Sequence, residues 1–325
     1  MKIAVVGFGA VGGLIGARLA SAGVEVSAVA RGATLAALRE HGARLQEDGQ
    51  TTGVSLRAVS DPADAGVQDV VILAVKATAL ADVAARIAPL VGPQTVVLTA
   101  MNGVPWWFFS GDKLPYAGTR LRSLDPGGAL ADAIPFDQVI GCVVHLSCSC
   151  PAPGVVRLGF GNRLIIGEPE GGLSERVHRL AALLRAAGFD VEESKDIRTD
   201  IWYKLWGNMT MNPVSAITGA TCDRVLDDPL VHAFCLAAMR EAAEIGAKIG
   251  CPIAQSGEDR MDVTRKLGAF KTSMLQDVEA GKPLEIDALV TAVHEIGRLV
   301  GVPTPNVDAL LGLVRLFART RGLYP

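Results

Sequence analysis

The sequence predicts an α/β protein in which an N-terminal doubly wound sheet with added antiparallel strands is followed by an all-α C-terminal domain. Three observations support this prediction. Short apolar runs alternate with helical segments up to about residue 110, a glycine-rich turn follows the first run, and helical patterns dominate from about residue 196 onward. Alternating strands and helices are typical of a mostly parallel sheet with helices on both faces.

Four apolar runs predict the parallel strands of the first domain. Helical patterns over residues 11–22 and 79–90 separate some of them. Strands that are buried on both faces are nearly continuous apolar runs rather than alternating ones, and these runs fit that description. The strands are expected at residues 3–6, 26–30, 69–75 and 95–99.

Residues 106–136 form a long segment that interrupts this alternation. It begins with the aromatic block Trp106-Trp107-Phe108-Phe109 and is then rich in glycine and proline, which predicts irregular structure. Buried anchoring of the segment explains the aromatic block most simply. A subunit contact and a wall of a substrate pocket are the alternatives.

The remainder divides into a β-rich part and a helical part. Antiparallel strands are expected at residues 139–149, 154–158 and 163–167, then a helix at 174–187 and a last strand at 189–193. The boundary falls near residues 194–198. We therefore expect a nucleotide-binding domain over residues 1–196 and a helical domain that binds substrate over residues 197–325.

Composition excludes several classes of function. The chain has 325 residues, half of them apolar and a fifth charged, with a net charge of −3 and no basic run, so nucleic acid is not an expected partner. No apolar run reaches the length of a membrane span, and the start of the chain is too short for a signal peptide, so a cytoplasmic location is expected. The six cysteines form no CxxC pair, which favours free thiols over a metal site, although His145 near Cys148 and Cys150 leaves a metal as the weaker alternative.

A glycine motif follows the first predicted strand and opens a helix. This context makes a G-x-G-x-x-G pattern a specific signal for a dinucleotide. The first glycine allows a tight turn, the second lets the backbone approach a pyrophosphate at the helix N-terminus, and the third permits close packing of helix on strand. The motif consists of Gly7, Phe8, Gly9, Ala10, Val11 and Gly12.

Three polar residues mark the carboxyl ends of predicted strands, where open α/β sheets bind ligands. Arg31 follows the second strand at a position where NAD-binding proteins carry an acid, and a guanidinium there favours the 2′-phosphate of NADP. Lys76 and Asn102 follow two later strands. A solvated lysine and a turn-forming Asn-Gly are the plain alternatives, but two such residues at one edge favour a site.

Lys204, Asn208 and Asn212 lie four residues apart in a stretch that is otherwise almost entirely apolar. On a helix their side chains fall within an arc of about 80°. A cation and two amides on one stripe of an apolar helix are costly unless something polar binds there. We therefore expect the chemistry at this stripe.

Glu285 is expected in the first turn of a helix over residues 284–300. Counting in helical steps places it on the apolar face, with Asp287 on the opposite face toward water. A carboxylate favoured by the helix dipole is the plain explanation, but it does not account for the choice of face. The apolar face comprises Leu289, Ala292, Val293, Ile296, Leu299 and Val300.

Over nearly the whole length of the chain, these motifs at these spacings resemble the ketopantoate reductases (2-dehydropantoate 2-reductases). The segment 106–136 departs from the compact family pattern, since it is longer and richer in aromatic residues and glycine. The shared motifs are the glycine turn, Arg31, Val75-Lys76-Ala77, Asn102-Gly103, Lys204-x3-Asn208-x3-Asn212-Pro213, Ser273-Met274-Leu275-Gln276-Asp277 and Glu285-Ile286-Asp287.

The resemblance implies a Rossmann-type domain and a helical domain with the substrate in a cleft between them. It implies NADP(H) as cofactor, Lys204 as general acid, and Glu285 as the group that holds a substrate hydroxyl. Asn102 would bridge cofactor and substrate, and Lys76 would lie beside the nicotinamide. The remaining substrate-binding residues would be Asn208, Asn212 and Ser273.

The implied reaction is the NADPH-dependent reduction of 2-dehydropantoate to (R)-pantoate in pantothenate biosynthesis. One alternative is a reductase of another 2-oxo acid, such as a dehydrogenase of branched hydroxy acids or an opine-like enzyme. A second is a non-catalytic protein that senses NADPH, which an intact proton donor disfavours. The resemblance is compatible with a homodimer.

Overall fold

The computed structural model describes all 325 residues, and the chain divides into two compact units. The first comprises Met1–Met101 and Gly128–Asp200, and the second comprises Asn102–Gly127 and Ile201–Pro325. The sequence sets a single boundary after residue 196. In the structure, the segment between residues 102 and 127 groups instead with the later helices, and helix α7 (Ile197–Thr218) runs from one unit into the other.

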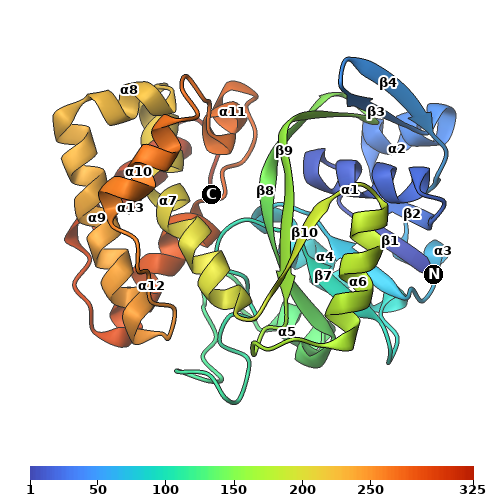
Figure 1. Cartoon of the computed structure of the whole chain (residues 1–325), viewed down its shortest axis with the longest axis horizontal. Coiled ribbons are helices and arrows are strands. Elements are labelled where there is room, and N and C mark those ends of the chain that lie inside the picture. Colours follow the sequence, from blue (N-terminus) through green and yellow to red (C-terminus); the bar gives the residue numbers. More distant parts are fainter. The chain divides into compact units, whose positions relative to one another are not determined.

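The first unit contains one ten-stranded sheet with the order β4-β3-β9-β8-β7-β6-β1-β2-β5, and β10 pairs with β9 (Figure 1). Only the β3–β4 and β8–β9 pairs are antiparallel. The strands are β1 (Lys2–Val6), β2 (Glu25–Val29), β3 (Ala43–Glu47), β4 (Gln50–Val54), β5 (Arg57–Val59), β6 (Val70–Leu73), β7 (Val96–Thr99), β8 (Val139–Ala152), β9 (Val155–Gly167) and β10 (Asp190–Ser194).

The expected doubly wound sheet is confirmed, with two local differences. The two short strands expected at residues 154–158 and 163–167 form one continuous strand, β9, with which β10 pairs in parallel. Strands β3, β4 and β5 were not predicted. Their sequences are short and largely polar, so the apolar signal that marks the buried strands is missing.

Helices cover both faces of the sheet. In β1, Ile3 and Val5 share a core with Leu14 of α1 and Leu180 of α6, while Ala4 between them is equally buried on the opposite face. Burial on both faces explains why β1 is a continuous apolar run. The helices are α1 (Ala10–Ser21), α2 (Gly32–His41), α3 (Pro62–Ala65), α4 (Leu80–Arg86), α5 (Ala129–Ala133) and α6 (Glu175–Ala186), with short 3₁₀ turns η1 (Ala77–Ala79), η2 (Ala88–Leu90) and η3 (Phe136–Gln138).

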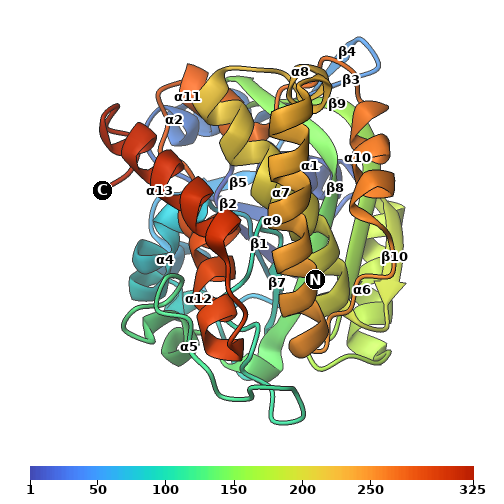
Figure 2. The same ribbon diagram turned by 90° about the vertical axis from the view of Figure 1, so that its left-hand side faces the viewer.

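The second unit is helical, and α9 packs against both α12 and α13 (Figure 2). The indole N–H groups of two tryptophans fix α7 against α9: Trp202 donates to Ala242 O at 3.2 Å and Trp206 to Met239 O at 2.6 Å. Its helices are α7, α8 (Cys222–Asp227), α9 (Pro229–Lys248), α10 (Gly257–Arg265), α11 (Ser273–Glu279), the π-helix η4 (Asp287–Thr291), α12 (Ala292–Val300) and α13 (Pro305–Arg319).

Residues 102–127, which we call the linker segment, group with the second unit, and their aromatic block Trp106–Phe109 is buried. Phe108 is fully buried, and its ring centroid lies 6.2 Å from that of Trp202 on α7. Glu295 on α12 holds the far end, since its carboxylate accepts hydrogen bonds from the backbone N–H groups of Arg122 and Ser123 and from the Ser123 hydroxyl, at 2.7, 3.0 and 2.6 Å. Buried anchoring, the simplest of the three interpretations, agrees with this packing.

Replacing Glu295 by glutamine should loosen the linker segment. Glutamine turns one of the two acceptor oxygens into a donor that would face N–H or O–H groups. We expect the free energy of unfolding to fall by about 1–2 kcal/mol and amide exchange to accelerate at residues 119–124, as measured by urea unfolding and hydrogen-exchange mass spectrometry.

Glu244→Gln is the matched control, because Glu244 makes only an exposed i,i+4 pair with Lys248. Equal exchange rates in the linker segment of the two variants would show that the Glu295 carboxylate does not hold it.

Candidate functional site

The glycine turn between β1 and α1 has the shape that a phosphate requires. Gly7 has a φ of +91°, and a Cβ on Gly12 would lie 2.2 Å from the Gly7 carbonyl oxygen, so neither position accepts a side chain. A Cβ on Gly9, in contrast, would meet nothing within 4 Å. Gly9 also precedes α1, which begins without a side-chain cap. The helix N-terminus is thus left open to an anion.

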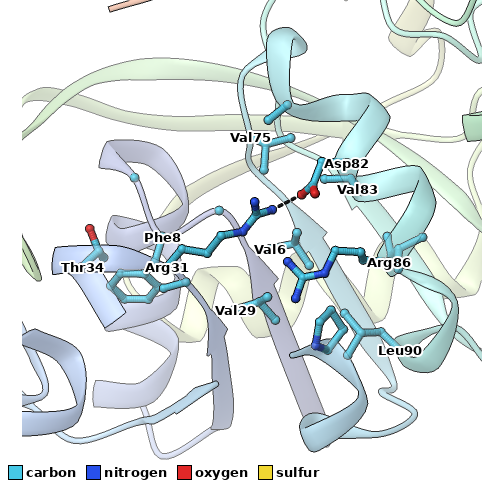
Figure 3. A pocket seen from close by; sticks show the side chains of 16 residues that line it. Val6, Phe8, Val29, Arg31, Thr34, Val75, Asp82, Val83, Arg86 and Leu90 are labelled. Carbon is cyan, nitrogen blue, oxygen red and sulfur yellow. Dashed lines mark hydrogen bonds and ion pairs between the residues drawn. The ribbon is translucent and has the colours of Figure 1, made fainter. Parts of the chain in front are cut away.

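A cavity of about 340 Å³ lies beside this turn, within the range of small-molecule sites (Figure 3). Gly7, Phe8 and Gly9 of the motif line it, as does Arg31. The open glycine turn, the free helix N-terminus and a cationic side chain are the features that a dinucleotide phosphate group needs, so the residues fit this cofactor class. Ala10, Val11 and Gly12 form the helix start behind the lining.

Arg31 follows β2 and precedes α2, as the sequence indicated. Its guanidinium forms an ion pair with Asp82 of α4, and both side chains are largely exposed. Arg86, one turn further along α4, donates from Nη2 to the Ser60 carbonyl oxygen at 2.7 Å. Two guanidinium groups and one carboxylate thus line the cavity.

Thr34, Asp82 and Arg86 line the cavity but were not identified from the sequence. Asp82 and Arg86 share a helix face by their spacing of four residues, which is the only local signal. Nothing in that pattern shows that the face meets Arg31, which lies 51 residues earlier in the chain.

Lys76 belongs to the first unit and is half-buried. It is the N-terminal flanking residue of the turn η1, and its carbonyl oxygen accepts from the Ala79 N–H group at 2.9 Å. The preceding residue, Val75, lines the cavity, whereas Lys76 does not. A role for Lys76 beside the nicotinamide stays a prediction.

In the second unit, α7 carries the predicted polar stripe. Lys204 Nζ donates to Asn102 Oδ1 at 2.7 Å, and both side chains are half-buried. Asn212 is only 4% exposed, and its Nδ2 lies 3.4 Å from the Ser273 hydroxyl. Asn208 is half-buried between them on the helix. The structure thus brings one predicted residue to each end of the stripe.

The linker segment fixes Asn102 through its neighbours. The Val104 N–H group donates to the Ala288 carbonyl of the π-helix at 2.9 Å. Gly103 has a φ of +82°, and a Cβ there would lie 2.4 Å from the same carbonyl oxygen. Only glycine permits this close approach, so the Asn-Gly pair attaches the partner of Lys204 to the π-helix.

Ser273 is positioned by the cap of α11. Thr272 accepts from the Leu275 N–H group at 3.2 Å and shares a 2.6 Å hydrogen bond with the Ser215 hydroxyl of α7. The Ser273 side chain itself is exposed. The helix begins at Ser273 because Thr272 is its N-cap.

The environment of Glu285 differs from the prediction in two ways. Glu285 precedes the helix instead of lying in its first turn, and the π-helix from Asp287 to Thr291 inserts an extra residue that breaks the helical count from residue 285. Of the six residues assigned to the apolar face, five are nevertheless buried and only Leu299 is exposed. Glu285 itself is half-buried.

Asp287 does not point to water as expected. It is half-buried and accepts hydrogen bonds from the Tyr324 hydroxyl at 2.7 Å and from Thr291 at 2.9 Å. Burial, followed by the hydrogen bond to Asp287, raises the pKa of Tyr324 to about 12. Tyr324 therefore remains a hydrogen-bond donor at neutral pH. Through these two hydrogen bonds, Asp287 connects the start of the π-helix to Tyr324 near the C-terminus.

No group of three or more histidine, cysteine or acidic side chains is arranged to hold a metal ion, and none of the six cysteines forms a disulfide. None of the helices combines the length and apolar character that crossing a membrane requires.

Known proteins match the chain along its entire length. Residues 3–106 match the family described as "Ketopantoate reductase PanE/ApbA", and residues 196–318 match its C-terminal part. A 2-dehydropantoate 2-reductase of Mesorhizobium japonicum is 46% identical over the whole of both chains.

Solved structures agree with the sequence matches. A protein of Ralstonia solanacearum MolK2 assigned as a ketopantoate reductase is 63% identical, with a TM-score of 0.97 over 99% of both chains. D-mandelate dehydrogenase, solved with NADH and anilino(oxo)acetate, shares the fold at 22% identity, with a TM-score of 0.86 over 99% of this chain and 100% of the other. On the strength of both domain matches and the full-length identity, the chain belongs to the ketopantoate reductase family of oxidoreductases.

Proposed function

We propose that this protein reduces a 2-oxo acid with NADPH, and that its substrate is 2-dehydropantoate, which it converts to (R)-pantoate for pantothenate biosynthesis. The observation that supports this most directly is the hydrogen bond of Lys204 to Asn102 in a member of this family. The Lys204 ammonium group is half-buried and donates to the neutral amide oxygen of Asn102. Such a group can serve an oxygen on which negative charge develops.

The cofactor residues lie in the first unit. The N-terminus of α1 at Gly9 would receive the pyrophosphate, and Arg31 would bind the 2′-phosphate. When bound, NADPH supplies a hydride to the C2 carbonyl carbon of the substrate. Lys76 stays in this proposal as the residue beside the nicotinamide.

Lys204 acts on the carbonyl oxygen. As an ammonium group it stabilises the negative charge there and donates the proton that completes the alcohol, a contribution of about 10²–10⁴-fold for general acids. Asn102 accepts one of the three Nζ protons through Oδ1 and so holds the ammonium group in the stripe. The Asn102 amide nitrogen remains a donor for cofactor or substrate.

The substrate groups away from the carbonyl fall to the other members of the stripe. Asn208, Asn212 and Ser273 supply neutral hydrogen-bonding groups, which bind a carboxylate without fixing a second charge in the site. Glu285 would accept the hydroxyl of 2-dehydropantoate. A substrate without that hydroxyl would lose this hydrogen bond to Glu285, which favours the hydroxylated acid.

Lys204→Ala should lower kcat/KM by about 10²–10⁴-fold because the proton donor is lost. The Kd for NADPH, measured by fluorescence titration, should change by less than about threefold, since the cofactor cavity lies in the other unit. Lys248→Ala is the control, because Lys248 makes only an exposed pair with Glu244 and a long contact to the Val300 carbonyl. Turnover of Lys204→Ala within a few-fold of the control would disprove the acid role.

Initial rates across a panel of 2-oxo acids test the substrate. With NADPH, kcat/KM should be largest for 2-dehydropantoate and should fall by about 10-fold or more for branched 2-oxo acids that lack its hydroxyl. Glu285→Gln should reduce the ratio of kcat/KM for 2-dehydropantoate to kcat/KM for the branched 2-oxo acids. A larger value for another oxo acid would identify a reductase of different specificity, and NADPH binding without oxidation by any acid would point to a sensor.

A further inference from the structure

The cofactor cavity contains a carboxylate that the expected binding of NADPH does not explain. Asp82 of α4 lines the cavity, and it is the only acidic residue among the lining side chains. Figure 3 shows its ion pair with Arg31, the residue that the proposed function assigns to the 2′-phosphate. The side chains of Arg31 and Asp82 are 62% and 43% exposed, so a ligand can reach both.

A carboxylate beside Arg31 opposes a phosphate in two ways. It neutralises the guanidinium in the free protein, so the phosphate must displace it, and it repels the phosphate once this has bound. The same carboxylate can accept a hydrogen bond from a ribose 2′-hydroxyl, which is the function of the acid at the end of the second strand in NAD-binding proteins. Here that strand is followed by Arg31, and the acid comes from α4 instead.

The other charged residue of the cavity does not cancel this effect. Arg86 lies one turn after Asp82, but its guanidinium donates to the Ser60 carbonyl oxygen rather than to the carboxylate. Asp82 forms its ion pair and its side-chain hydrogen bond with Arg31 alone. The charge that a 2′-phosphate meets at Arg31 is therefore set by the ionised carboxylate of Asp82.

We propose that Asp82 is a specificity-determining residue that moderates the preference for NADPH over NADH. It weakens the hold of Arg31 on the 2′-phosphate and supplies a partner for the free 2′-hydroxyl. This inference rests on the proposed role of Arg31. It adds that the cavity is built to accept both cofactors, with the balance set by one carboxylate on α4.

Calorimetric titration with 2′,5′-ADP and 5′-AMP tests the inference without any turnover. In Asp82→Asn, the affinity for 2′,5′-ADP should rise by about 3- to 10-fold while the affinity for 5′-AMP stays the same or falls. The gain should shrink at high salt, because both side chains are exposed to solvent. An unchanged ratio of the two affinities would overturn the proposal, as would an equal rise for both ligands.

Glu192→Gln is the matched control. Glu192 forms an ion pair with Arg163 whose side chains are 46% and 50% exposed, nearly the same as in the Asp82 pair, and neither residue lines the cavity. Glu192→Gln removes one negative charge from the first unit, as Asp82→Asn does. An equal gain in affinity for 2′,5′-ADP in Glu192→Gln would mean that net charge causes the effect, and it would overturn the role of Asp82.

The variant Arg31→Gln distinguishes a failure of the proposed function from a failure of the inference about Asp82. If Arg31 binds the 2′-phosphate, this variant should bind 2′,5′-ADP no more tightly than 5′-AMP, and adding Asp82→Asn should bring no further gain. If Arg31→Gln leaves the affinity ratio at the wild-type value, the assignment of the 2′-phosphate in the proposed function fails. If only Asp82→Asn is without effect, the proposed function stands and the inference about Asp82 fails.

Discussion

The hydrogen bond between Lys204 Nζ and Asn102 Oδ1 imposes a requirement on the rest of the helical unit. A half-buried ammonium group must keep a polar partner, and this partner comes from a residue 102 positions earlier in the chain. Its placement needs the aromatic block of the linker segment to be buried beside Trp202, and it needs Gly103 to lie against Ala288 without a side chain. The position of the Lys204 side chain in the stripe therefore depends on the packing of the linker segment.

In the first unit, the glycine turn leaves the backbone at the N-terminus of α1 exposed, where a ligand could bind. A Cβ added to Gly7 or Gly12 would lie within 2.6 Å of a neighbouring atom, so neither position can hold a side chain. A Cβ on Gly9, between them, would meet no atom within 4 Å. The buried strands and α1 share one core and supply the rigidity behind this turn. Arg31, which precedes α2, and Asp82 on α4, the two residues that we propose to distinguish NADPH from NADH, line the cavity beside this turn and lie outside that core.

Local patterns in the sequence were sufficient for features that depend on neighbouring residues. The buried strands β1, β6 and β7, the glycine turn and the stripe of α7 were all predicted, because burial and helical spacing leave a direct trace in residue order. The π-helix was missed because one inserted residue leaves no trace in the composition, and Glu285 lies outside the expected first turn because the helix begins at Ile286. The grouping of the linker segment with the second unit and the place of Asp82 in the cavity were missed for another reason: the residues that they contact lie far away in the chain, and no single sequence records such pairings.

The assignment of residues 102–127 to the second unit has a consequence for how the protein is made and divided. The chain passes between units three times, after residues 101, 127 and 200. During synthesis the aromatic block leaves the ribosome well before α7 and α12 exist, so it must wait, exposed, for the helices that cover it. A fragment cut at residue 197 would lack both Asn102 and the side chains that pack on Trp202. The helical unit is therefore compact in space but not a separable piece of the polypeptide.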